Sequence, residues 1–411
     1  MLSEAKYFKN VLTIMTGTSV AQAIPIIISP ILTRIYTPED FGLFALYMSL
    51  YSVLGVVATG RYELAIILPR RGEEAYQLAV IAATISCLIS AILLVLVALF
   101  QDQIASLVNN ESIAGWLYLI PLSVLVSGLY QVFNYWFNRN GLYRSIAINR
   151  VLQTFSTAAG QLSISFVFQS IGLIIGQLIG QSISLVSYIR KFLKQDYGNH
   201  TFDLVLAKKL LYRHSQFPKI DVPTAFMNVA ASQAPNFLLA SLFSANSAGF
   251  FYLTQRVLQA PITLIAGSFL DVFKQRASED YKRDGHCRDI FKKTFVMLFL
   301  LSVPTSTILY FWIKDIFILV FGPEWEDAGE YAKILIPALS LRFMANPLSF
   351  VIYIAEKQRI NLVGMLVLML LILTSLLVPS TALGAVYGIS FSYCFVYFFY
   401  LIISARFAKV L

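Results

Sequence analysis

The sequence predicts an all-α integral membrane protein with twelve transmembrane helices. The first observation is a series of long apolar stretches, in a chain that is 58% hydrophobic and has a mean hydropathy of +0.71. A helix needs about 20 apolar residues to cross a bilayer core of about 30 Å. The second observation is that lysine and arginine fall mostly on alternate connecting segments. A water-soluble core cannot hide so many stretches, which excludes a soluble protein.

The apolar stretches give the predicted elements in chain order. Because every backbone N–H and C=O in lipid must be paired within the protein, each stretch is expected to be a helix. The first stretch is expected to be retained, because its apolar run continues well past a sequence that resembles a signal-peptide cleavage site. The predicted spans are 11–33, 41–67, 77–99, 113–136, 147–168, 171–189, 219–242, 248–270, 294–313, 332–354, 362–378 and 386–404.

The basic residues predict the orientation of these spans. Of 31 Lys and Arg residues, 25 lie at the two ends of the chain, in the loops after the even-numbered spans, or within the first four residues of the span that follows. On the opposite side lie only Arg34, Lys314 and, at the start of the next span, Lys333. Cytoplasmic loops are enriched in Lys and Arg, so both termini are expected in the cytoplasm. The net charge of +9 follows from this bias and from attraction to anionic lipid, and no nucleic-acid partner is expected.

An internal repeat predicts two lobes. Gly42-Leu43-Phe44-Ala45-Leu46 in the first half matches Gly249-Phe250-Phe251-Tyr252-Leu253 in the second, and further blocks follow in the same order. Each half holds six predicted spans, so the halves share one orientation, as in a parallel repeat about an axis along the membrane normal. The predicted organisation is a six-helix lobe over 1–189, a cytoplasmic linker over 190–217, and a six-helix lobe over 218–411. The linker is expected to form either a short amphipathic helix on the inner leaflet, with Leu204, Leu206, Leu210 and Leu211 on its apolar face, or a solvated connection.

Charged residues at membrane depth are the candidate site, because a charge in hydrocarbon is costly and usually faces a cavity or a partner. A planar guanidinium suits phosphate, because it donates two parallel hydrogen bonds. Alternatively, the charges nearest the span ends reach the interface, or the carboxylates are paired to nearby cations. The candidate cations for an anionic substrate are Arg61, Arg256, Arg342 and Lys219, and the candidate ion-coupling carboxylates are Glu63 and Asp221.

Two of these candidates lie close together in sequence. Arg61 and Glu63 are two residues apart, so on a continuous helix they would point to different faces and would not pair.

Several chemistries are not expected. No Walker A sequence is present, which argues against a built-in ATPase. The three histidines form no cluster and the three cysteines show no metal-type spacing, so neither a metal nor a cofactor is predicted. No loop between spans is long enough for a catalytic domain, so an enzyme is not predicted.

Four segments carry a family resemblance: Thr33-Arg34-Ile35-Tyr36-Thr37-Pro38-Glu39-Asp40-Phe41-Gly42, Arg61-Tyr62-Glu63-Leu64-Ala65, Gln255-Arg256-Val257-Leu258-Gln259-Ala260-Pro261, and Phe321-Gly322 followed by Trp325 and Ala328-Gly329. Over essentially the whole chain, the sequence resembles the polysaccharide transport branch of the multidrug/oligosaccharidyl-lipid/polysaccharide (MOP) exporter superfamily. Within that branch it is similar to the O-antigen (Wzx-type) flippases.

The resemblance implies two lobes in a V like that of MATE transporters, around a lumen lined by cations at Arg61, Arg256 and Arg342. It implies a flippase of the bacterial inner membrane that moves undecaprenyl-diphosphate-linked oligosaccharide, a building block of O-antigen and lipopolysaccharide, to the periplasmic leaflet. Membrane lipids, a polymerase and a chain-length regulator are the implied partners. Two alternatives stay open: an ion-coupled multidrug antiporter, and a membrane glycan transferase or ligase.

Overall fold

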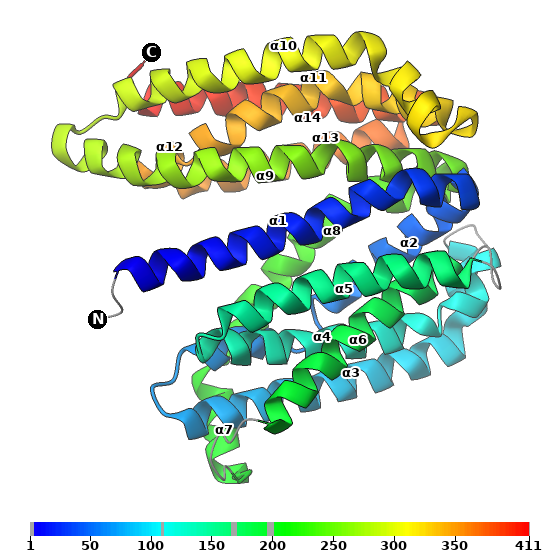
Figure 1. The fold of residues 1–411 in the computed structure, drawn as a ribbon, viewed down its shortest axis with the longest axis vertical. Helices are drawn as coiled ribbons and strands as arrows, with labels where there is room; N and C mark the ends of the chain where they lie inside the picture. Colours follow the sequence, from blue (N-terminus) through cyan, green and yellow to red (C-terminus); the bar gives the residue numbers. More distant parts are fainter. Residues whose placement is uncertain (1–3, 108–110, 166–170, 195–200, 411) are drawn as a thin grey trace. The chain divides into compact units, whose positions relative to one another are not determined.

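The computed structural model describes residues 4–107, 111–165, 171–194 and 201–410. Within these ranges all regular secondary structure is helical (Figure 1). The chain divides into two compact units, Met1–Ala245 and Asn246–Leu411. The predicted lobes and linker rest on the sequence repeat, a different criterion, and they stay a prediction. Part of the predicted linker, 195–200, lies outside the described residues.

The first unit holds eight α-helices and three short helical turns within the described residues. In chain order these elements are α1 (Glu4–Ile35), α2 (Pro38–Gly55), η1 (Tyr62–Ile67), α3 (Gly72–Leu107), η2 (Glu111–Trp116), α4 (Leu119–Arg139), α5 (Tyr143–Ile164), α6 (Gly172–Lys194), α7 (Leu204–Arg213), η3 (Phe217–Asp221) and α8 (Val222–Leu242).

The second unit follows with α9 (Ala245–Asp284), whose first residue is the last of the first unit. The remaining elements are α10 (Arg288–Phe321), η4 (Pro323–Trp325), α11 (Glu326–Leu348), α12 (Val351–Ile354), α13 (Gln358–Leu377) and α14 (Ala382–Phe407).

The protein is a multi-pass membrane protein. Every range predicted as a span contains helix, although residues 166–168 at the end of the fifth range lie outside the described residues. Eight helical segments of the described chain are long and apolar enough to cross a membrane: Leu12–Ile35, Gly72–Ser106, Ile113–Arg139, Gly172–Lys194, Arg288–Phe321, Pro323–Ile354, Gln358–Leu377 and Ala382–Phe407. The other four predicted crossings, at α2, α5, α8 and α9, stay a prediction.

Local sequence explains where α2 begins. Thr37 and Asp40 form a reciprocal capping box at the start of α2: the Thr37 hydroxyl accepts from the Asp40 N–H, and the Asp40 carboxylate accepts from the Thr37 N–H at 2.9 Å. Pro38 stands at the first helical position, where its missing N–H costs nothing. This end of the helix is therefore specified by local sequence.

Small residues let α5 and α6 pack closely, and the two helices lie side by side in Figure 1. A Cβ on Gly176 would lie 2.4 Å from the backbone nitrogen of Gln161, and a Cβ on Gly160 would lie 3.0 Å from the Cα of Gly176. Polar side chains of α5 use this closeness: Asn149 donates to the carbonyl of Ser184 at 3.1 Å, and Gln161 to that of Leu173 at 3.2 Å. These bonds satisfy buried amide groups where lipid and water are both excluded.

The predicted amphipathic helix in the linker is confirmed as α7. Asp203 caps it by accepting from the N–H groups of Val205 and Leu206. Its Leu210 is buried in a cluster that includes residues of η1, α3, α4 and α6. The Tyr62 hydroxyl of η1 also donates to the α7 carbonyl of Leu211 at 3.2 Å. The helix is therefore docked on the first unit.

In the second unit, α11 packs against α9, α10 and α14. The Thr254 hydroxyl of α9 donates to the carbonyl of Ala328 at 2.8 Å, and the Ser390 hydroxyl of α14 donates to that of Ile334 at 2.6 Å. Farther along α9, Phe273 belongs to a buried cluster with residues of α10, α11 and α12. These contacts position the two candidate arginines of this unit, Arg256 and Arg342.

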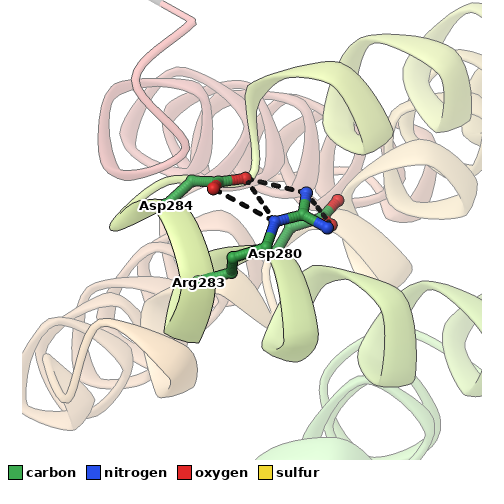
Figure 2. A network of polar contacts seen from close by, with 3 residues as sticks. All are labelled: Asp280, Arg283 and Asp284. Atoms are coloured by element: carbon green, nitrogen blue, oxygen red, sulfur yellow. Dashed lines mark hydrogen bonds and ion pairs between the residues drawn. The ribbon is translucent and has the colours of Figure 1, made fainter.

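The last turn of α9 carries an exposed ion cluster. Arg283 donates to Asp284 at 2.8 Å and to Asp280 at 3.3 Å (Figure 2). Both acceptors are carboxylates, so this guanidinium is already neutralised. The hydrogen bond from Arg283 lowers the pKa of Asp284.

Candidate functional site

The backbone breaks between α2 and η1, which corrects the prediction of one helix over 41–67. The α-helix ends at Gly55, and three-residue turns follow, with the Gly60 N–H donating to the Val57 carbonyl at 3.0 Å. Gly60 and Arg61 then both have positive φ, of 59° and 63°. Glycine adopts this left-handed conformation without penalty, whereas for arginine it costs about 1–2 kcal/mol. Apolar residues continue through the break, so hydropathy alone did not reveal it.

The break brings Arg61 and Glu63 together, which corrects the expectation that they would not pair. Arg61 Nη1 lies 3.7 Å from Glu63 Oε1. The Thr59 hydroxyl also donates to the Glu63 carboxylate. Glu63 is only 1% exposed. Its buried carboxylate is therefore stabilised by the Arg61 guanidinium and the Thr59 hydroxyl.

Arg61 keeps part of its hydrogen-bonding capacity unused. Its side chain is 28% exposed, and its Nε is buried without a hydrogen-bond partner among the described residues. The ion pair to Glu63 is also longer than a charge-assisted hydrogen bond of about 2.8 Å. The guanidinium therefore retains donors for a further acceptor.

Two residues from distant parts of the chain complete the electrostatic surroundings of Glu63. Asp221, in η3, and Tyr135, in α4, both lie within electrostatic range of its carboxylate. The structure thus brings both candidate coupling carboxylates, Glu63 and Asp221, into one cluster of the first unit. Lys219 is exposed on η3 and forms no ion pair within the described part of the chain.

In the second unit, Arg256 lies half-buried on α9. Its guanidinium interacts with the hydroxyl of Tyr252, electrostatically and by a hydrogen bond. Residues four apart share one face of a helix, so the pair follows from helical spacing. The Thr254 hydroxyl bond to α11 fixes the rotation of this part of α9.

Arg342 lies half-buried on α11 and faces two tyrosines of α14. Tyr393 and Tyr397 are both within electrostatic range of its guanidinium. Their rings stack on each other, with centroids 5.9 Å apart and planes 19° from parallel. Across the residues that the structure describes, Arg342 forms no ion pair.

Sequence reasoning did not single out Tyr393 and Tyr397, which the structure places beside Arg342. The two tyrosines are four residues apart, which places both rings on one face of α14. This spacing was the feature of the sequence that could have indicated the pair. An arginine beside paired aromatic rings offers two chemistries at once: donors for an anionic group, and flat apolar faces for an uncharged ring. Whether the cations of both units line one cavity stays a prediction.

Comparison with known families gives one match. Residues 31–330 match the family described as polysaccharide biosynthesis protein. A comparison with curated protein sequences found no match.

Solved membrane transporters share the fold. A lipid II flippase, MurJ, in an inward closed conformation is similar at a TM-score of 0.75 and 16% identity, over 96% of this chain and 87% of that one. An inward-facing MATE-family multidrug resistance transporter of the MOP superfamily has a TM-score of 0.67 at 13% identity, over 96% and 95% of the two chains. A MOP superfamily transporter from Pyrococcus furiosus, described as having a binding pocket of reverse polarity, has a TM-score of 0.62 at 12% identity, over 98% and 96%.

At these identities the structural likeness shows the fold, which is that of MOP-superfamily transporters. The family match covers well over half of the chain and includes Arg61, Glu63, Lys219, Asp221 and Arg256, whereas Arg342 lies beyond it. On the strength of that match, the chain belongs to the polysaccharide biosynthesis protein family.

Proposed function

We propose that the protein is a flippase that moves undecaprenyl-diphosphate-linked oligosaccharide repeat units, of O-antigen or a related surface polysaccharide, from the cytoplasmic to the periplasmic leaflet of the bacterial inner membrane. The observation that carries the proposal is Arg342 beside the stacked Tyr393 and Tyr397, in a chain of the polysaccharide biosynthesis family. A guanidinium suits a diphosphate and aromatic faces suit sugar rings. The fold shared with a lipid II flippase supports the same substrate class.

The proposed mechanism is alternating access. Arg61, Arg256 and Arg342, with Lys219, hold the diphosphate, while the polyprenyl tail stays in lipid. Electrostatic stabilisation of an anion is strong at such sites, because little water screens it. Both termini lie in the cytoplasm in this scheme, and a polymerase and a chain-length regulator act on the product.

An ion gradient would drive the cycle through Glu63 and Asp221. Two carboxylates within electrostatic range of each other disfavour double ionisation, so they form a natural site for a proton or a sodium ion. The neighbouring Arg61 couples this site to the substrate, because the same guanidinium faces Glu63 and offers donors to a diphosphate.

The same carboxylate cluster favours a second candidate, an ion-coupled multidrug antiporter, whose fold the MATE-family structures share. A cationic drug would need carboxylates at the binding site, whereas the candidate residues of the second unit are arginines. Transport should therefore require Arg342 if the protein is a flippase, whereas drug efflux should not require it if the protein is an antiporter.

The test uses a strain whose own copy of the gene is deleted and replaced by Arg342→Ala or Arg256→Ala. The proposal expects loss of surface glycan with normal membrane abundance of the protein. Arg276→Ala is the control, because Arg276 is exposed on the same helix as Arg256. Normal glycan in both variants, or drug resistance that depends on the protein, would contradict the flippase.

A further inference from the structure

An apolar hollow of about 940 Å³ lies on the first unit between α1 and α5. Its lining includes Leu12, Val20, Ile148 and Phe155, all exposed large hydrophobic side chains. The two helices approach closely beside the hollow, where a Cβ on Gly17 would lie 2.6 Å from that of Ala147.

A second hollow, of about 530 Å³, lies on the neighbouring face between α5 and α6. Its apolar lining includes Ile183 and Val186, and three cations line its other end: Arg190, Lys191 and Lys194. Leu152 lines both hollows. The two hollows therefore adjoin at this side chain, and together we call them the depression, which is apolar along α1 and α5 and basic at the end of α6.

The register of α5 and α6 places the cations at the rim of this depression. The helices are antiparallel neighbours, and Asn149 donates to the carbonyl of Ser184. Arg190 is six residues beyond Ser184, or about 9 Å along the axis, which puts it level with the start of α5. The apolar lining of α5 runs from Ala147 to Phe155, about 6 to 18 Å along the axis from the level of Arg190.

None of the three cations forms an ion pair with any other described residue. Their charge is therefore available to an outside anion. An amphiphile with an anionic head and an acyl chain satisfies both ends of the depression. A zwitterionic lipid offers the same chains but no net charge for three cations to attract.

We propose that this depression binds an anionic glycerophospholipid of the inner leaflet, with its phosphate at Arg190, Lys191 and Lys194 and an acyl chain along α1 and α5. Basic residues that end a membrane helix commonly mark such sites. Each charge near an anionic surface contributes roughly a fivefold preference, so losing two lowers the preference about 30-fold. The inference is independent of the transported substrate.

The test places an indole in the apolar hollow. Phe155→Trp is well tolerated on exposure grounds, since Phe155 is 63% exposed. The full chain is reconstituted in phosphatidylcholine nanodiscs that contain a small fraction of phosphatidylglycerol brominated on its acyl chains, and quenching beyond that of the unsubstituted protein is measured. We expect stronger quenching by brominated phosphatidylglycerol than by equally brominated phosphatidylcholine, and loss of that preference in Arg190→Gln/Lys194→Gln.

Lys208→Gln/Lys209→Gln is the matched control, because it removes two exposed cations of α7 that line neither hollow. It should keep the preference. Equal quenching by the two lipids would overturn the proposal, as would a preference that survives in Arg190→Gln/Lys194→Gln. Displacement of phosphatidylglycerol by stoichiometric undecaprenyl diphosphate would overturn the assignment to a phospholipid.

Discussion

Arg61 Nη1 lies 3.7 Å from Glu63 Oε1 because the chain between them is not α-helical. On a continuous α-helix, residues two apart point to different faces, and these two side chains would diverge. The left-handed conformation at Gly60 and Arg61 turns them toward each other. The conformation of one short segment therefore decides whether the buried carboxylate has a counterion.

The first prediction separates the two members of this pair. Arg61→Ala leaves Glu63 buried without its cation and should lower the free energy of unfolding by about 2 kcal/mol. Glu63→Gln keeps an oxygen for the Thr59 hydroxyl and removes the buried charge, so its loss should stay below about 1 kcal/mol. Thermal unfolding of both variants in one detergent measures the difference. Equal destabilisation would show that the pair is not coupled.

The second prediction concerns the stacked tyrosines. Tyr397→Ala removes a ring face beside Arg342, and transport of the lipid-linked glycan should fall about tenfold, equivalent to about 1.4 kcal/mol. Tyr397→Phe keeps the ring and should retain more transport than the alanine variant. Tyr387→Ala is the control on the same helix, since Tyr387 is 55% exposed. Surface glycan, normalised to protein abundance in the membrane, is the readout.

The third prediction tests the close packing of α5 and α6. Gly176→Ala would bring a Cβ to within 2.4 Å of the Gln161 nitrogen, so the helices must separate and stability should fall by about 2 kcal/mol or more. At Gly267, in α9, a Cβ would meet nothing within 4 Å. Gly267→Ala should therefore be neutral, or stabilise by about 0.5–1 kcal/mol through helix propensity. The free energies of unfolding of the two variants, measured in the same detergent, test this difference.

The fourth prediction is a pH dependence of α7 docking. Burial and the adjacent Arg213 lower the pKa of His214, while Glu74 opposes them. Because the docked state disfavours the proton, the undocked chain binds more protons once the pH falls below about 6.5, the ordinary histidine value. Docking should therefore weaken as the pH falls from 7.5 to 5.5. Limited proteolysis of the 201–217 segment measures it, and His214→Gln should remove the pH dependence of cleavage.

Hydropathy predicted the positions of the helices well and their ends poorly. The eighth and ninth predicted spans, 248–270 and 294–313, lie inside helices that run over Ala245–Asp284 and Arg288–Phe321. Hydropathy marks only the part of a helix that crosses the apolar core of the membrane. The helix itself continues into water as long as its side chains favour the helical conformation. The capping box at Thr37 and Asp40 was a better signal, since it marks the helix end itself.

The candidate site was predicted only in part. Individual charges at membrane depth stand out in the sequence, so Arg61, Arg256 and Arg342 were proposed as site residues. Contacts between distant parts of the chain could not be predicted in this way: Asp221 lies within electrostatic range of Glu63, although the two are far apart in sequence and no periodicity relates them. Nor does an apolar sequence reveal a left-handed turn within it. Glycine at position 60 permits such a turn but does not require it.

The guanidinium of Arg139 shows what the unused donors of Arg61 mean. Arg139 ends α4 and donates to the carbonyls of Ile66 and Pro69 and, at 3.4 Å, to that of Arg70, so the chain after η1 already occupies it. Both arginines carry the same charge, yet Arg61 keeps a buried N–H group, at its Nε, that has no acceptor among the described residues. The capacity of such a membrane protein to bind anions therefore depends on how many arginine N–H groups lack an acceptor within the protein. The number of arginines alone overestimates that capacity.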